Sequence, residues 1–374
     1  MAQQSILYVI NHPDWFWSHR LPLAAGARDA GYRVLVAMPG GAGDEKLSEY
    51  GFTGLDLPEV AGAGGVFKTV FALRRLIAQH RPGIVHAITL KYAFMTGLAA
   101  RLTGVQVVHT VAGLGYLFSA EGIKPKILRT LIGPFLKLAL NGKSIRVIFQ
   151  NPDDLDLLVK RGFVRRERTA LIRGSGVDTH VFKPREHAGE ADPPVVLMPT
   201  RLVRDKGVAV FVEAARILKA EGMRARFQIA GGLSAGNPLA MTEAEMKALC
   251  ADGAVEWLGP IKDMPGLFST VCLVAYPSYY REGVPKVLLE AAAMGKAIVT
   301  TDHPGCREAV SHGVNGLLFP VRDAKACADS IRTLLDDPVR RAAMGRAGRD
   351  LALREFDVKH VVAETLKVYS GLRG

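Results

Sequence analysis

The sequence predicts an α/β protein built from two doubly wound, Rossmann-like domains. Short β-rich runs alternate with longer helical segments, a pattern typical of parallel sheets covered by helices on both faces. The alternation stops at the polar stretch 183–194 and then begins again. A length of 374 residues also favours two domains over one. In each domain, ligands are expected at the carboxyl ends of the strands.

The expected elements follow from the apolar runs and from the glycines and prolines that end them. In the first half we expect strands at 5–10, 33–38, 84–87 and 105–110, and helices at 21–30, 66–79 and 92–103. In the second half we expect strands at 195–200, 226–230, 271–276 and 297–301, and a helix at 208–221. We therefore place domains at 1–182 and 195–357, a linker at 183–194, and at 358–374 an amphipathic helix hypothesised to pack back on the first domain.

The composition is that of an ordinary globular protein, with 49% apolar and 22% charged residues. The four cysteines lie far apart and form no CxxC pair, which argues against a disulfide framework or a zinc site and suits a reducing cytoplasm. The first residues lack the basic start and apolar run of a signal peptide. No apolar run reaches the roughly 18 residues that a bilayer crossing needs. We expect a cytoplasmic protein.

Positive charge is concentrated in one part of the chain. The net charge is +12, and residues 60–150 hold twelve Lys or Arg against one acid, Glu121, so the remainder is close to neutral. Within 123–149, cations alternate with apolar residues, which is typical of a helix that lies on an anionic membrane surface. Gly133-Pro134 predicts that this segment forms two helical pieces. The membrane-binding candidates are Lys124, Lys126, Arg129 and Lys137.

Two other interpretations of the basic segment stay open. It is also compatible with an ordinary core helix that has a solvated basic edge. Nucleic-acid binding would use the same charge, but neither an aromatic stacking platform nor a known binding motif accompanies it. We therefore expect an anionic membrane surface as a partner and no nucleic acid.

The most informative stretch is 279–295, YYREGVPKVLLEAAAMG. Pro285 suits the first position of a helix and Gly295 its end. The helix is apolar nearly all round and should be buried, so Glu290 within it would be costly unless its charge meets donors. Glu282 lies just before the helix. Incidental acids on a solvated helix are the alternative.

Both carboxylates suit sugar and ribose hydroxyls, because each can accept two hydrogen bonds. The free amides of Gly283, Val284 and Lys286 at the helix N-terminus suit anions or sugar oxygens. A second cluster, Arg201 to Gly207 (RLVRDKG), directly follows a predicted strand. Arg201 and Lys206 could converge on a diphosphate, although basic loop residues are often merely solvated.

Three weaker signals accompany these clusters. Residues 173–178, RGSGVD, carry glycines that permit a tight backbone course. His109 ends an apolar strand, and we leave open whether it touches a ligand or completes core packing. Asp154 and Asp156 match the AspXAsp string of metal-dependent transferases, but their position at a helix start favours a capping role.

Taken in order, these motifs resemble the retaining GT-B glycosyltransferases of family four, and the match covers nearly the whole chain. The motif carriers are Glu282 and Glu290 with GlyValPro between them, the Arg201–Lys206 loop, and the GlyValAsp…Phe element at 176–182. Three further stretches are similar to members that extend polyprenyl-diphosphate-linked glycans: HRLP at 19–22, HTVAGLG at 109–115 and PGCREA at 304–309.

The resemblance implies a role for each matching residue. Arg201 and Lys206 would bind the donor diphosphate, Glu290 the ribose hydroxyls, and Glu282 the transferred sugar. The backbone at Gly283, Val284 and Pro285 would line the same sugar. His109 is counted with the catalytic residues, although Ala112 stands where many relatives carry a further histidine. His19 and Arg20 could meet an acceptor phosphate, or simply form an exposed helix end.

The resemblance also implies an activity: a metal-independent, retaining hexosyltransferase without a cofactor. The first domain would hold the acceptor and the second the nucleotide sugar. We expect a UDP-sugar, carrying an N-acetylhexosamine or hexose, as donor and a polyprenyl-diphosphate-linked saccharide as acceptor. The product would enter bacterial surface-glycan or glycoprotein-glycan assembly, at the cytoplasmic face of the inner membrane. A nucleotide-sugar epimerase of the same fold and a non-catalytic sugar-nucleotide or lipid-binding protein are the alternatives.

Overall fold

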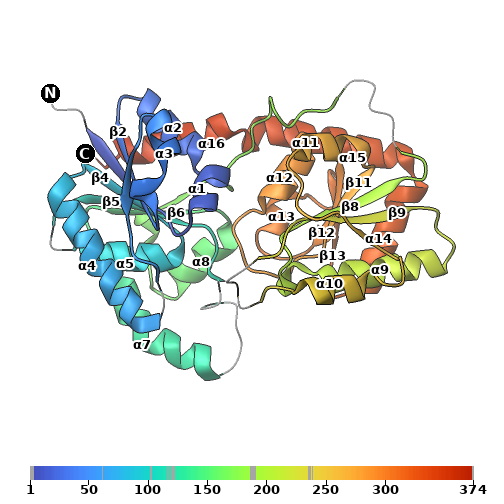
Figure 1. Cartoon of the computed structure of the whole chain (residues 1–374), viewed down its shortest axis with the longest axis horizontal. Helices are drawn as coiled ribbons and strands as arrows, with labels where there is room; N and C mark the ends of the chain where they lie inside the picture. The colour runs from blue at the N-terminus through green and yellow to red at the C-terminus, as the bar shows by residue number, and fades with distance from the viewer. Residues whose placement is uncertain are drawn as a thin grey trace. The chain divides into compact units, whose positions relative to one another are not determined.

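The computed structural model describes residues 4–60, 62–101, 103–115, 118, 123–185, 191–234, 237 and 239–372, without the side chains of residue 63 and of 123–125. The chain divides into two compact units (Figure 1). Unit 1 contains residues 1–175 and 358–374, and unit 2 contains residues 176–357. The prediction of two doubly wound α/β domains is confirmed, since each unit contains one parallel sheet flanked by helices.

The sheet of unit 1 has seven parallel strands in the order β3-β2-β1-β4-β5-β6-β7. Most of its strand positions are buried, because helices cover both faces of the sheet. Strands that are buried on both faces are continuous apolar runs in the sequence. The strand order reverses between β1 and β4. The strands are β1 (Ser5–Val9), β2 (Arg33–Met38), β3 (Thr53–Asp56), β4 (Ile84–Ile88), β5 (Gln106–Val111), β6 (Ile145–Phe149) and β7 (Thr169–Leu171).

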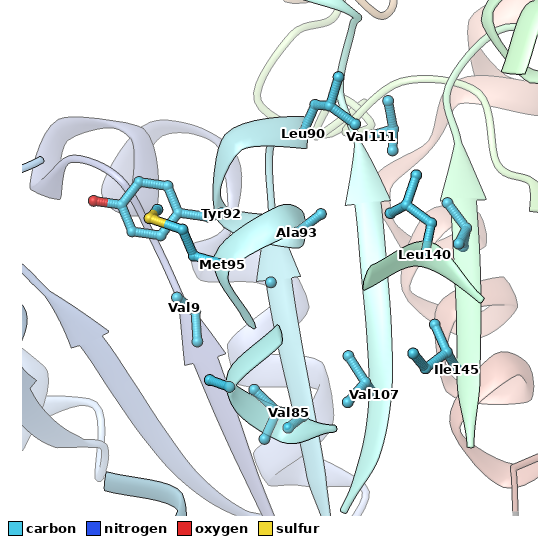
Figure 2. Close-up of a cluster of buried hydrophobic side chains, with 14 of the residues drawn as sticks. Val9, Val85, Leu90, Tyr92, Ala93, Met95, Val107, Val111, Leu140 and Ile145 are labelled. Carbon is cyan, nitrogen blue, oxygen red and sulfur yellow. The ribbon is translucent and has the colours of Figure 1, made fainter. Parts of the chain in front are cut away.

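Two hydrophobic clusters fill the two faces of this sheet. One is shown in Figure 2, where side chains of β1, β4, β5 and β6 meet those of α5 and α7. On that face α5 packs against both α4 and α7. The other cluster lies under α1, α2 and α16. The helices are α1 (Pro13–His19), α2 (Leu21–Asp29), α3 (Glu45–Glu49), α4 (Gly62–His80), α5 (Leu90–Ala100), α7 (Ile123–Leu140), α8 (Pro152–Lys160) and α16 (Val358–Ser370).

The prediction that Gly133-Pro134 divides the basic segment into two helical pieces is wrong. Helix α7 runs through Pro134 without a break. A proline inside a helix costs about 3 kcal/mol, since it removes one hydrogen bond and crowds the preceding turn. Burial of the inward-facing Leu136, Ala139 and Leu140 outweighs that cost, because full burial of one leucine side chain alone contributes about 1.5–3 kcal/mol.

The last helix, α16, completes unit 1 by packing against α2. Tyr369 reaches through to the central strands, where its hydroxyl lies 3.1 Å from the Tyr8 hydroxyl and 2.5 Å from His86 Nδ1. His86 Nε2 in turn lies 2.7 Å from Thr110 Oγ1. Burial raises the pKa of the Tyr369 phenol and lowers the pKa of His86, so both side chains are neutral at pH 7. The segment 358–374 therefore belongs to the fold of unit 1.

Unit 2 has a six-stranded parallel sheet in the order β10-β9-β8-β11-β12-β13. Its strand order reverses between β8 and β11. The strands are β8 (Val195–Pro199), β9 (Arg226–Ala230), β10 (Glu256–Trp257), β11 (Leu273–Tyr276), β12 (Ala297–Thr301) and β13 (Gly316–Phe319). The helices are η3 (Arg204–Lys206), α9 (Val208–Ala220), α10 (Glu243–Leu249), α11 (Met264–Thr270), α12 (Lys286–Ala293), α13 (Cys306–Ala309), α14 (Ala324–Asp336), α15 (Pro338–Leu351) and the π-helical η4 (Ala352–Phe356).

The division between the units lies before the linker that the sequence suggested. We expected the first domain to end at residue 182, but the segment after Gly176 contacts unit 2. The Val177 amide donates to the Phe356 carbonyl at 2.9 Å, and the Arg349 guanidinium donates to the carbonyls of Thr179 and Phe182. Residues 186–190 of the suggested linker lie outside the described residues.

Within the ranges described above, every helix falls short of the length and apolar character that a bilayer crossing demands.

We predict that Tyr369→Phe destabilises unit 1. The substitution leaves the buried His86 Nδ1 and Tyr8 hydroxyl without this partner, at a cost of about 1–3 kcal/mol. The melting temperature should fall by about 2–4 °C per kcal/mol. Ser370→Ala is the matched control, because that exposed hydroxyl bonds only within its own helix. Equal melting temperatures for the two variants would contradict the prediction.

Candidate functional site

The candidate site of unit 2 lies where its strand order reverses. Strands β8 and β11 pair in parallel, with Val196 beside Leu273. Their carboxyl ends therefore meet at the same edge of the sheet, which is where doubly wound sheets bind ligands. The loop after β8 carries Arg201 and Lys206, and the loop after β11 carries Glu282. Sheet topology thus brings together the two clusters that the sequence analysis found separately.

Glycines allow the loops at this edge to pack backbone against backbone. Gly207 has φ +81°, and a Cβ atom there would stand 2.1 Å from the Pro277 carbonyl oxygen. Gly231 lies even closer to the first loop, since a Cβ there would stand 1.6 Å from the Thr200 carbonyl oxygen. Only glycine permits these approaches. The Gly207 contact fixes the loop that carries Lys206 against the loop that carries Glu282, and the Gly231 contact fixes it against the segment after β9.

Lys206 and Glu282 form an ion pair that is largely withdrawn from water. The lysine side chain is 5% exposed and the glutamate side chain 21%. The Tyr276 hydroxyl donates to the same carboxylate at 3.1 Å. The ammonium also lies 5.5 Å from the centre of the Tyr276 ring and 5.1 Å from that of Tyr280, within the range of cation–π attraction. The charge of Lys206 is therefore held in a fixed position at the strand ends.

The surroundings of this pair hold neighbouring acids in their neutral forms. Burial, together with the nearby Glu282, raises the pKa of the Tyr276 phenol well above its ordinary value. The same two causes raise the pKa of the Cys306 thiol to about 11. Tyr276 is thus a hydrogen-bond donor to Glu282 at any physiological pH. Cys306 is a thiol there and not a reactive thiolate.

Helix α12 leads from this site into the core. It starts one residue after Pro285, which occupies the N-cap, and ends before Gly295 at φ +67°. In its first turn the Leu288 amide donates to the Pro285 carbonyl at 3.0 Å. Glu290 is 8% exposed, and burial raises the pKa of its carboxyl. Lys286 Nζ lies 3.5 Å from Glu290 Oε1 and opposes that shift.

This partner of Glu290 was not predicted. The buried acid was expected to meet donors from a ligand, but Lys286, one turn earlier on the same helix, already supplies one. The i,i+4 spacing of the two residues was visible in the sequence. Glu290 nevertheless keeps acceptor capacity, because an ionised carboxylate can accept about four hydrogen bonds.

Arg201 lies on the same loop as Lys206 but in a different environment. Its side chain is exposed, and Nη1 donates to Ser234 Oγ at 3.3 Å, in the segment after β9. Arg201 is therefore a cation at the rim of the site, whereas Lys206 lies inside it.

The PGCREA stretch at 304–309 forms another wall of the site. Gly305 has φ +87°, and a Cβ there would stand 1.8 Å from the Gly283 carbonyl oxygen. The backbone of Gly283 is thus fixed from both sides, by Gly305 and by the start of α12. This packing explains why a glycine precedes Cys306 in the motif.

The structure places His109 in the core of unit 1. It is the fourth residue of β5, fully buried, and its Nε2 lies 3.2 Å from the Ala139 carbonyl. Burial lowers the pKa of His109 to about 4, so the ring is neutral and Nε2–H donates to Ala139. Its Nδ1 is a buried atom without a hydrogen-bond partner in the described residues. Of the two roles left open by the sequence, this geometry favours core packing.

The segment after β1 carries His19 and Arg20. The His19 ring stacks on Trp15, with 5.6 Å between centroids, and its Nδ1 lies 2.7 Å from Ser18 Oγ. Arg20 is 7% exposed, and burial lowers its pKa to about 10. No carboxylate pairs with this guanidinium in the part of the chain that the structure describes. Arg20 is thus not the exposed helix end that the sequence also allowed.

Thr89 is a residue that sequence reasoning missed. It follows β4, beside β1 where the strand order reverses, and its φ of +77° and ψ of 149° fall in a region used almost only by glycine. No pattern in the sequence marks a strained threonine. Tyr276 and Tyr280 were missed as well, although both lie in or beside the quoted 279–295 stretch.

The two acids of the AspXAsp string serve local structure. Asp154 is buried at the start of α8, where the Asn151 side chain donates to its carboxylate at 3.1 Å. Asp156 pairs with Arg166 at 2.6 Å. The two carboxylates thus have different partners.

Comparisons with known proteins find a family for each of the two units. The family described as "Glycosyl transferases group 1" matches residues 182–351, and that described as "Glycosyl transferase 4-like domain" matches residues 17–175. The N,N'-diacetylbacillosaminyl-diphospho-undecaprenol alpha-1,3-N-acetylgalactosaminyltransferase of Campylobacter jejuni is 27% identical over 366 residues, 94% of each chain. The D-inositol 3-phosphate glycosyltransferase of Thermobispora bispora is 30% identical over 319 residues, 79% of this chain and 73% of that relative.

A solved structure extends the similarity to the fold. Anabaena HepE in complex with UDP and glucose covers 98% of this chain and 99% of its own, with a TM-score of 0.78 and 22% identity. At that identity the likeness shows a shared fold.

We predict that Gly207→Ala destabilises unit 2 more than Gly222→Ala does. Both glycines have the same left-handed backbone, at φ +81° and +80°, which costs an alanine about 1–2 kcal/mol. Open space surrounds Gly222, whereas a Cβ at Gly207 meets the Pro277 carbonyl. Urea unfolding should therefore show a larger decrease in the free energy of unfolding for Gly207→Ala than for Gly222→Ala. Equal losses would mean that the two loops are not held by this contact.

We predict that stability falls as pH decreases from 6.5 toward 4, partly because of His109. The unfolded chain binds a proton near pH 6.5, and the folded chain binds it only near pH 4. The contribution of His109 to the free energy of unfolding is thus fully present above pH 6.5. Between pH 6.5 and 4 that contribution falls by up to about 1.4 kcal/mol per pH unit. Urea unfolding at several pH values should show a shallower slope for His109→Gln.

His360→Gln is the control for this measurement, because His360 is exposed in the folded chain. His86 is also buried and contributes to the wild-type slope, so His109→Gln should reduce the slope without abolishing it. An unchanged slope in His109→Gln would show that His109 is protonated equally easily in both states.

Proposed function

The chain belongs to the group 1 glycosyltransferases, and from this membership we propose that it transfers a sugar from a UDP-linked donor to a polyprenyl-diphosphate-linked saccharide, with retention of configuration. Its two parallel-sheet α/β domains have the GT-B fold. The single observation that carries the proposal is the buried Lys206–Glu282 pair at the strand ends of unit 2.

Donor binding is proposed for the loops after β8 and β11. Lys206 and the rim residue Arg201 would hold the diphosphate, and Glu290 the ribose hydroxyls. Glu282 would receive hydroxyls of the sugar, together with the backbone from Gly283 to Pro285. Support for a uridine donor comes from HepE, a structural neighbour solved with UDP and glucose. The transferred sugar is proposed to be an N-acetylhexosamine or a hexose.

The chemistry requires charge stabilisation on the leaving group. As the bond between the sugar and the diphosphate breaks, negative charge grows on the phosphate oxygen that leaves. A fixed cation nearby stabilises this state more than the ground state. Lys206 is suited to this role because Glu282, Tyr276 and Tyr280 restrain its ammonium before the donor arrives. We propose that these cations act without a metal ion and that the leaving oxygen accepts the acceptor's proton.

Acceptor binding is proposed for unit 1, with Arg20 as the phosphate-binding residue and His19 beside it. A buried cation without a carboxylate partner is costly, and an incoming phosphate would supply the missing charge. Two relatives support this class of acceptor, since the printed name of each contains an undecaprenol diphosphate. They are the Campylobacter enzyme and the Escherichia coli UDP-Gal:alpha-D-GlcNAc-diphosphoundecaprenol alpha-1,3-galactosyltransferase. We propose that the product enters bacterial surface-glycan or glycoprotein-glycan assembly.

Membrane association is proposed for α7, at the cytoplasmic face of the inner membrane. Helix α7 is apolar on its outward face as well as its inward one, with Leu131 at 65% and Phe135 at 55% exposure. Lys126 and Lys137 are exposed beside them, and Arg129 is half-buried. The Lys124 side chain lies outside the described residues. On α4, the helix across α5 from α7, Phe67 and Phe71 are also exposed, so the proposed surface includes two helices.

We predict that Lys206→Ala and Arg201→Ala each lower the rate of sugar transfer at least ten- to hundredfold. Losing one hydrogen bond to a charged group costs about 1.5–3 kcal/mol, and 1.4 kcal/mol corresponds to tenfold in rate. The assay uses labelled UDP-sugars with a polyprenyl-diphosphate-linked saccharide. Arg204→Ala is the matched control, because Arg204 is an exposed cation of the same loop that pairs with Glu245.

The same assay separates the alternatives. A labelled lipid product supports transfer, whereas an isomerised donor without acceptor would indicate an epimerase, and binding without turnover a non-catalytic protein. Turnover near wild type in folded Lys206→Ala would remove Lys206 from the site.

A further inference from the structure

A basic hollow lies at the edge of unit 1 opposite to its strand carboxyl ends. It has a volume of about 500 Å³ and is bordered by the end of α5, the starts of β5 and β6, and the turn that follows α7. Four cations line it and no acid does: Arg101, Lys143, Arg165 and Arg168. This hollow has no part in the proposed donor or acceptor sites.

The cations of the hollow are not neutralised by the protein. Arg165 lies 4.0 Å from the exposed Glu167, which makes at most a weak surface pair. For the other three, no carboxylate lies within ion-pairing distance among the residues that the structure describes. Like charges gathered without a counter-charge repel one another, so an anion between them relieves that repulsion.

Backbone contacts hold two of these cations in place. The Arg101 guanidinium donates to the Asn141 carbonyl at 2.6 Å and to the Leu138 carbonyl at 3.3 Å. Arg168 donates to the Lys143 carbonyl at 2.7 Å. An arginine has five N–H donors, and these bonds leave several for a ligand. Two of the four cations, Arg101 and Arg168, are therefore held in place before a ligand binds.

The hollow adjoins the outward apolar face of α7. That face comprises Ile127, Leu128, Leu131, Phe135 and Leu138, which are 40–65% exposed. Leu138 belongs to this face, and its carbonyl is bonded to Arg101 of the hollow. If α7 lies flat in the membrane interface, the hollow is at the level of the lipid headgroups.

We propose that this hollow binds the phosphate group of an anionic lipid headgroup. The inference rests on the proposed function for the presence of a membrane, but not for any residue of the transfer reaction. Bidentate arginine–phosphate contacts would give the site its affinity, and α7 would deliver the headgroup to it. The bound lipid would be distinct from the acceptor, because the acceptor site is proposed at the opposite edge of the sheet.

The test is co-sedimentation of the full chain with lipid vesicles. One set contains phosphatidylcholine alone, and the other contains phosphatidylcholine mixed with phosphatidylglycerol. Lys143→Gln combined with Arg165→Gln removes the two cations whose side chains bond no backbone carbonyl. Each cation at an anionic surface contributes about a factor of five, so binding to the mixed vesicles should fall roughly thirtyfold.

The matched control removes the same charge elsewhere on unit 1. Arg33→Gln combined with Lys46→Gln changes two exposed cations that lie outside the hollow and form no described ion pair. This control should bind the mixed vesicles within about twofold of wild type, because charges beyond about 10 Å are screened. Equal losses in both double variants, or none in the first, would overturn the proposal.

Two further measurements separate the sources of phosphate and the two proposals. Calorimetric titration with inorganic phosphate tests a free anion. If Lys143→Gln/Arg165→Gln loses phosphate binding but binds vesicles as wild type does, the assignment to lipid is overturned. Transfer to a short-chain, detergent-free acceptor should be the same in this variant as in wild type. Absence of transfer in wild type itself would contradict the proposed function and leave the vesicle result standing.

Discussion

The site of unit 2 depends on one ion pair between loops that are far apart in the chain. Lys206 and Glu282 are both largely removed from water, and burying two charges costs several kcal/mol each unless their geometry is good. The pairing of β8 with β11 supplies that geometry, because it ends both strands at the same edge. Tyr276 adds a hydrogen bond and a ring face to the same pair. Removal of either partner would leave the other as an uncompensated buried charge.

The same arrangement explains why glycines occur where they do. Gly207 and Gly231 let backbone lie against backbone around the first loop, and Gly305 does the same for the second. Any side chain at these positions would separate the loops and move the lysine from the carboxylate. A site for a polar, flexible ligand is thus built on contacts that have little freedom. Such preorganisation is the property that lets charged groups act strongly on a reaction.

Much of the fold could be predicted from the sequence, because buried parallel strands are continuous apolar runs. Strands such as Arg33–Met38, Arg226–Ala230 and Ala297–Thr301 agree with the expected bounds to the residue. The continuity of α7 through Pro134 could not be predicted, since tertiary packing there outweighs a local rule. The motifs singled out Arg201, Lys206 and Glu282 as separate clusters, which the sheet topology brings to one edge, but they did not reveal Tyr276 or the strained Thr89. Their significance comes from neighbours that only the folded chain supplies, and the residue roles themselves remain proposals.

The hydrogen bond between Tyr8 and Tyr369 joins the first strand of the chain to its last helix. Unit 1 is therefore discontinuous, and unit 2 is inserted between its two parts. On a ribosome, α16 emerges after the whole of unit 2, so the part of the first sheet that α16 covers stays exposed while unit 2 is synthesised. All residues of unit 2 are synthesised before α16, so unit 2 can complete its core while unit 1 still lacks this helix. The nascent chain must protect that apolar surface from aggregation until α16 has been synthesised and can pack on it.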